Sequence, residues 1–70
     1  MKATLNKNRT VTLSGLTVNE WNAIKVILHA ANDRCFDEQE EDGDWFSNDD
    51  FMVTLNNKER EALRKVCEVI

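Results

Sequence analysis

Carboxylates are the residues of this sequence that lie close enough together to do chemistry. Nine of the 13 acidic residues fall between Asp33 and Asp50, and Arg34 is the only basic residue in that stretch. Clustered carboxylates can bind a cation, take part in acid–base catalysis, or attract a basic macromolecule. The residues around the cluster favour one of these uses over the others.

Calcium binding is the first use to weigh. Several positions of a twelve-residue EF-hand loop are matched, by Glu38, Glu40, Asp42, Gly43, Asp44 and Asp49. An EF-hand loop begins with Asp and ends with a bidentate Glu, whereas this segment offers Glu38 and Asp49, and the residues that follow favour a strand. We therefore expect no metal site and no cofactor.

Catalytic side chains are sparse. His29 is the only histidine, and at helical spacing it falls beside polar residues, which is typical of a solvated surface position. Cys35 and Cys67 each lie among apolar residues at helical spacing, where a reduced cysteine behaves as a small buried hydrophobe. The sequence contains no glycine-rich phosphate loop, nucleophile elbow or Cys-x-x-Cys pair. We expect no enzymatic activity.

Binding to a protein is the use that the cluster favours most. Aromatic residues within and beside it supply rigid apolar area, and the surrounding charges would steer a basic partner. The predicted partner-binding residues are Asp37, Glu38, Glu40, Glu41, Asp42, Asp44, Trp45, Asp49 and Asp50. In a second interpretation of equal weight, Phe46 and Phe51 belong to the core, Trp45 lies over a sheet, and the carboxylates only solubilise a loop.

Two helices are predicted from capping signals. Thr17 can cap a helix with Glu20 returning the hydrogen bond, and an apolar stripe then recurs from Trp21 to Cys35 at steps of three and four. We expect this helix to end near Cys35 or Phe36. Asn56 with Glu59 forms a second such signal, followed by an apolar stripe that runs to Ile70.

Two hairpins are predicted from β-branched and aromatic runs. Thr10–Leu13 and Phe51–Leu55 are the stronger strands, and Ala3–Leu5 and Asp44–Ser47 are their partners. The expected fold class is α+β, with two hairpin–helix units (ββαββα) that form one antiparallel sheet with both helices on one face. Residues 1–70 would form one domain, with units at 3–35 and 45–70 and an acidic connection at 36–44. Val11 and Leu13 would face the core.

The size and charge of the chain limit its partners. Seventy residues build one small core, which usually needs a disulfide, a metal or a second copy for stability. The net charge of −4 opposes binding to phosphate backbones and anionic membranes, so we expect neither a nucleic-acid nor a membrane partner. No apolar run approaches the roughly 20 residues of a membrane span, and we expect a cytoplasmic protein.

Three functional hypotheses remain. The first is a small acidic inhibitor or adaptor that occupies a basic, nucleic-acid-binding surface; in size and charge, though in no motif, the chain is similar to compact acidic bacteriophage proteins, including those that block restriction or CRISPR nucleases. The host cytoplasm would then be its location. The second is a structural or regulatory homodimer whose sheet edges pair, with a passive acidic loop. The third is a DNA-binding protein, because the strand and capped helix from Arg9 to about Leu28 resemble the start of a ribbon-helix-helix repressor. The chain departs from that family after the helix, where an acidic loop replaces the repressor's second helix.

Overall fold

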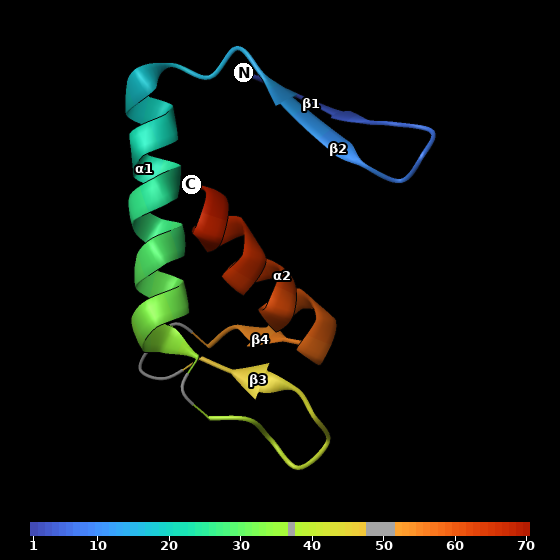
Figure 1. Ribbon diagram of the computed structural model, residues 1–70, viewed down its shortest axis with the longest axis vertical. Coiled ribbons are helices and arrows are strands. Elements are labelled where there is room, and N and C mark those ends of the chain that lie inside the picture. Colours follow the sequence, from blue (N-terminus) through green and yellow to red (C-terminus); the bar gives the residue numbers. More distant parts are fainter. Residues whose placement is uncertain (37, 48–51) are drawn as a thin grey trace.

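The chain begins with a hairpin that projects from the rest of the molecule (Figure 1). The computed structural model describes residues 1–36, 38–47 and 52–70. In it β1 (Lys2–Leu5) pairs antiparallel with β2 (Val11–Ser14), so that Ala3 lies opposite Leu13 and Leu5 opposite Val11. The turn closes because Asn6 N–H donates to the Thr10 carbonyl at 2.8 Å. The first predicted hairpin is therefore present.

The first helix, α1 (Val18–Ala30), starts at the predicted cap. Glu20 N–H donates to the Thr17 hydroxyl at 3.1 Å, and Thr17 N–H donates to the Glu20 carboxylate at 2.9 Å. The second bond stabilises the charged carboxylate and holds the pKa of Glu20 below its ordinary value. A π-helical turn, η1 (Ala31–Cys35), extends the helix to the predicted end.

The second half of the chain contains a shorter hairpin and the second helix. The strands β3 (Trp45–Phe46) and β4 (Thr54–Leu55) pair antiparallel, and α2 (Asn57–Val69) follows at once. The predicted cap is again present, since Glu59 N–H donates to the Asn56 side chain at 2.8 Å and the Glu59 carboxylate accepts from Asn56 N–H at 3.0 Å. Both capping predictions are thus confirmed.

The arrangement of the strands differs from the expected one. The fold is a small α+β structure, but the described strands form two separate two-stranded sheets and not one sheet of four. The helical run of α1 and η1 covers 18 residues, Val18 to Cys35, which is about 25 Å at 1.5 Å per residue. Because the two hairpins adjoin opposite ends of this run (Figure 1), their edges are too far apart to pair.

The helices pack on each other and on the second hairpin. Contacts join α1 to α2, and join α2 to β4 and to η1. Cys67 Sγ lies 3.4 Å from the Leu28 carbonyl and links the two helices; Cys35 and Cys67 are both free and half-buried. None of the helices in the described parts of the chain has the length and apolar character needed to cross a membrane.

The core is thin. Among the described residues only Phe36 and Ser47 are buried, and Phe36 is the only apolar one. The prediction that Val11 and Leu13 face a core is wrong: these side chains are 62% and 50% exposed. Their hairpin makes no extensive contact with another described element, so its apolar residues have little to pack against in the described part of the chain.

The first cap gives a direct test of local stability. Thr17→Ala removes the hydroxyl that accepts from Glu20 N–H, and we expect it to lower the free energy of unfolding by about 1 kcal/mol. Thr17→Ser keeps the acceptor and is the control. Urea unfolding followed by circular dichroism measures both variants, and equal losses in the two would contradict the role of the cap.

Candidate functional site

The acidic residues from Glu40 to Asp44 lie in a short hydrogen-bonded turn. Gly43 N–H donates to the Glu40 carbonyl at 3.0 Å, and Glu40 N–H donates to the Asp44 carbonyl at 2.7 Å. Asp44 N–H also donates to the Asp42 carboxylate at 3.0 Å. Gly43 has a φ of 94°, a left-handed conformation that favours glycine and lets the chain reverse here. We call residues 39–45 the acidic turn.

The base of the acidic turn is fixed on both sides. An isolated bridge pairs Gln39 with Trp45, and the Gln39 side-chain amide donates to the Gly43 carbonyl at 2.9 Å. Trp45 is also paired with Leu55 of β4. The backbone of the turn is therefore held in one shape, which is the condition for the carboxylates to form a defined surface.

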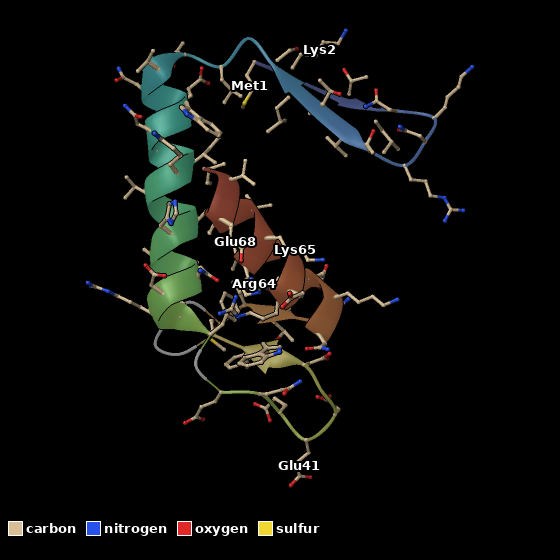
Figure 2. All side chains as sticks on the ribbon, in the orientation of Figure 1. Met1, Lys2, Glu41, Arg64, Lys65 and Glu68 are labelled. Carbon is tan, nitrogen blue, oxygen red and sulfur yellow. The ribbon has the colours of Figure 1, made fainter. Side chains whose placement is uncertain are left out.

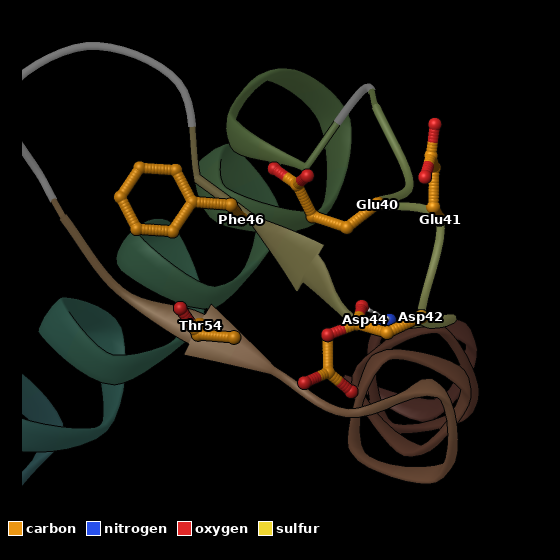
Figure 3. Close-up of a pocket in the computed structure, with 6 residues that line it drawn as sticks. All are labelled: Glu40, Glu41, Asp42, Asp44, Phe46 and Thr54. Atoms are coloured by element: carbon orange, nitrogen blue, oxygen red, sulfur yellow. Dashed lines mark hydrogen bonds between the residues drawn. The ribbon is translucent and has the colours of Figure 1, made fainter.

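Four carboxylates of the turn line one hollow. Its volume is about 500 Å³, and its lining residues are Glu40, Glu41, Asp42, Asp44, Phe46 and Thr54. The side chain of Glu40 reaches back toward Phe46, while Glu41 points away (Figure 3). None of the described residues that line the hollow is basic, so these residues do not neutralise its negative potential, which suits a cationic group.

Phe46 supplies the apolar part of this hollow. Its side chain is 40% exposed, which leaves a ring face available beside the carboxylates. Trp45 and Phe46 are neighbours on β3, so one points toward the helices and the other away. The second interpretation of the sequence, in which Phe46 belongs to the core, is wrong for Phe46 because so much of its side chain is exposed. Phe51, the other residue of that interpretation, lies outside the described residues.

Trp45 lies against α2 and holds the turn in place. Its indole N–H donates to the Asn57 side chain at 3.3 Å, and its ring centroid is 5.5 Å from the Arg60 guanidinium carbon. The indole is half-buried. The contacts of the indole with α2 set the orientation of the acidic turn.

Arg60 joins the elements that carry the site. Its guanidinium donates to the Asn32 side-chain oxygen at 2.7 Å and to the Asn32 carbonyl at 3.1 Å. It also lies 5.8 Å from the Phe36 ring centroid, in addition to its contact with Trp45. One cation thereby connects α2, η1 and the acidic turn. No residue pattern near Arg60 in the sequence indicates this role, since Asn32 lies 28 positions away.

The remaining predicted site residues are placed as follows. Glu38 is exposed just before the acidic turn, and Glu41 points away from the body of the protein at the far end of the molecule from Lys2 (Figure 2). Asp37, Asp49 and Asp50 lie outside the described residues. The structure therefore gathers four of the nine around one hollow, with Trp45 behind them.

Two acids of α2, Glu61 and Glu68, have a basic partner. Arg64 pairs with Glu61 and Glu68 along one side of the helix (Figure 2). The hydrogen bond from Arg64 holds the pKa of Glu61 below its ordinary value. These two glutamates match the glutamates of the acidic turn in chemistry and make suitable controls for them.

Comparisons of the chain with known protein families, with curated proteins and with solved structures found no match. The function is therefore argued from the site alone. Among the described residues no group of three or more His, Cys, Asp or Glu side chains is arranged to hold a metal ion. The chemistry that the described site offers is a shaped cluster of negative charge with one exposed aromatic ring.

Proposed function

We propose that this chain is a non-catalytic protein-binding protein whose acidic turn docks on a basic surface of its partner. The observation that carries the proposal is the hollow that four carboxylates and Phe46 line beside a hydrogen-bonded turn. Carboxylates held in this way attract lysine and arginine side chains from a distance, and the ring adds apolar contact area once they meet.

The acidic turn suits a partner surface that normally binds nucleic acid. Lysine and arginine side chains that contact phosphates can equally contact a row of carboxylates, so the acidic turn would compete for them. The protein would then act as an inhibitor of a basic nucleic-acid-binding protein, such as a restriction or CRISPR nuclease. The affinity of such a complex falls with added salt, and the nucleic acid itself displaces the acidic protein.

Replacing Glu40 and Glu41 by glutamine tests the proposal. The change removes two charges from the acidic turn but no backbone hydrogen bond, so the turn should keep its shape. We expect the affinity for the partner to fall by about tenfold or more at physiological salt. The reason is that these carboxylates would both attract the basic partner and pair with its side chains. Isothermal titration with a partner captured from lysate and then purified gives the affinity.

The matched control is the double variant Glu61→Gln/Glu68→Gln, which removes the same charge from α2. We expect its affinity for the partner to stay within about twofold of that of the unmodified chain. The change in net charge alters only the long-range attraction and none of the contacts of the acidic turn. Affinity should fall steeply between low and high salt, and duplex DNA should displace the chain. Equal losses in both double variants, or a complex that salt does not weaken, would contradict the proposal.

A further inference from the structure

The chain exposes far more surface than a monomer of its size usually does. Its accessible surface is 5821 Å², whereas a folded monomer of 8.1 kDa is expected to expose about 4,500 Å². The radius of gyration is 13.7 Å, compared with about 11 Å for a compact domain of 70 residues. The excess of about 1,300 Å² exceeds the roughly 800 Å² that each partner buries in a standard interface.

Part of this excess is an apolar face on the first hairpin. The register places Ala3, Leu5, Val11 and Leu13 on one face of β1 and β2, because residues directly opposite each other point to the same side. Leu5 is 78% exposed. A two-stranded hairpin is marginal in water unless its apolar face packs against something. The face therefore needs a cover that the other described residues of the chain do not provide.

A second apolar surface is a groove between α1, β4 and α2. It has a volume of about 380 Å³, and Glu59 is the only charged residue among the described ones that line it. Its walls include Leu28 and Ala31 from the first helical run and Val66 from α2, with Phe36 in the lining. A groove lined this way by described residues suits an apolar surface of similar length.

We propose that the hairpin of one copy lies with its apolar face in the groove of a second copy, and that the exchange is reciprocal. Such a two-fold arrangement covers both surfaces in both copies and closes at a dimer, because each chain gives one hairpin and receives one. The contact is between a sheet face and a helical groove, and does not require the sheet edges to pair. It is separate from the acidic turn.

The chain's own hairpin cannot reach the whole groove. Ser14 is held in the ladder and Thr17 in the capping box, so only Gly15 and Leu16 are left to span the roughly 10 Å between packed layers. Folded back, the hairpin would carry Leu5 about 10 Å along α1. Ala31 lies about 20 Å beyond Thr17 along the helix. A hairpin from a second copy has no such tether.

The charges of the two surfaces also fit. Residues 1–19 contain Lys2, Lys7 and Arg9 and no acidic residue, while residues 20–70 contain all 13 acidic residues and six lysines and arginines. A basic hairpin is therefore attracted to the acidic body of another copy. Attraction of this kind orients the hairpin before the apolar surfaces meet.

Sedimentation equilibrium tests the proposal on the unmodified chain. We expect a mass of twice 8.1 kDa at tens of micromolar. Leu5→Glu places a charge in the apolar face. We expect it to raise the dissociation constant of the dimer by about a hundredfold or more. Thr4→Glu changes the neighbouring residue on the opposite face of the same strand and should leave the dimer intact. A monomeric unmodified chain would overturn the proposal.

The groove has an equivalent pair of variants. Val66→Glu adds a charge to the groove lining, whereas Val69→Glu adds it to an exposed position outside the lining. We expect only Val66→Glu to give a monomer, with circular dichroism showing that the helices remain. A dimer that resists both Leu5→Glu and Val66→Glu uses another interface and overturns the proposal.

Cross-linking identifies the occupant without relying on the folding of those variants. Isotopically heavy chains that carry a photoreactive residue at Leu5 are mixed with light chains, exchanged and irradiated. We expect heavy-to-light cross-links onto groove residues such as Ala31 and Val66. Cross-links found only within one chain would show that the hairpin folds back, and would refute the exchange. Neither result depends on whether the acidic turn binds a basic partner.

Discussion

Phe36→Ala is expected to unfold most of the protein at 25 °C. Phe36 is the only buried apolar residue among those described, with 6% of its surface exposed. Truncating a buried phenylalanine typically lowers the free energy of unfolding by about 3–5 kcal/mol. A core of this size supplies roughly 3–5 kcal/mol in all, so the loss is comparable with the total. Far-ultraviolet circular dichroism with and without urea measures the folded fraction.

Phe46→Ala is the matched control, because it removes the same side chain from a 40% exposed position. We expect it to lower the free energy of unfolding by less than about 1 kcal/mol while weakening the partner complex in which the ring takes part. The two phenylalanines thus separate stability from binding. Phe36→Ala and Phe46→Ala variants with equal stability would show that the core does not depend on Phe36.

Local signals in the sequence predicted the helices well. A capping box involves residues three positions apart, so the information needed to recognise it lies within one turn of chain. Thr17 with Glu20 and Asn56 with Glu59 both form the predicted hydrogen bonds. The first hairpin was also found near its predicted position, because alternation of apolar residues is itself a local property. In the second hairpin β4 covers only Thr54–Leu55 of the predicted Phe51–Leu55, and Phe51 lies outside the described residues.

The relation between the two hairpins could not be predicted in the same way. The similarity of the two hairpin–helix units suggested that their strands share one sheet. Whether they do depends on the position of the second hairpin, which is set by the length and direction of α1. Val11 and Leu13 show the consequence, since their alternation correctly indicates one apolar face and says nothing of what covers it. A pattern identifies a face to be buried, and only the tertiary structure or a second copy supplies its partner.

The candidate site shows the same division. The run of acidic residues is visible in the sequence, and so is Gly43, whose freedom allows the turn. The roles of Trp45 and Phe46 depend on which face of β3 meets α2, and a shift by one residue would exchange them. Arg60 is 28 positions from Asn32, so no local pattern could reveal their contact.

Arg60→Ala is the second change for which we expect a large effect. It removes two hydrogen bonds to Asn32 and the contacts of one cation with the Phe36 and Trp45 rings. It also leaves the half-buried Asn32 side-chain oxygen without the guanidinium donor. Losses of this kind amount to about 2–4 kcal/mol, most of the stability of so small a protein. The midpoint of urea unfolding measures the change.

Two further variants separate the geometry of Arg60 from its charge. Arg60→Lys keeps the charge but lacks the planar fork that donates to two oxygens, so we expect it to recover only part of the stability. Lys58→Ala removes an exposed charge two positions earlier and should change the free energy of unfolding by less than about 0.5 kcal/mol. In a Trp21→Phe background, the emission of Trp45 should shift to longer wavelength in Arg60→Ala, because the indole loses its cover and the acidic turn its fixed orientation. An Arg60→Ala variant as stable as Lys58→Ala, with unchanged Trp45 emission, would mean that the contacts of Arg60 do not hold the acidic turn against α2.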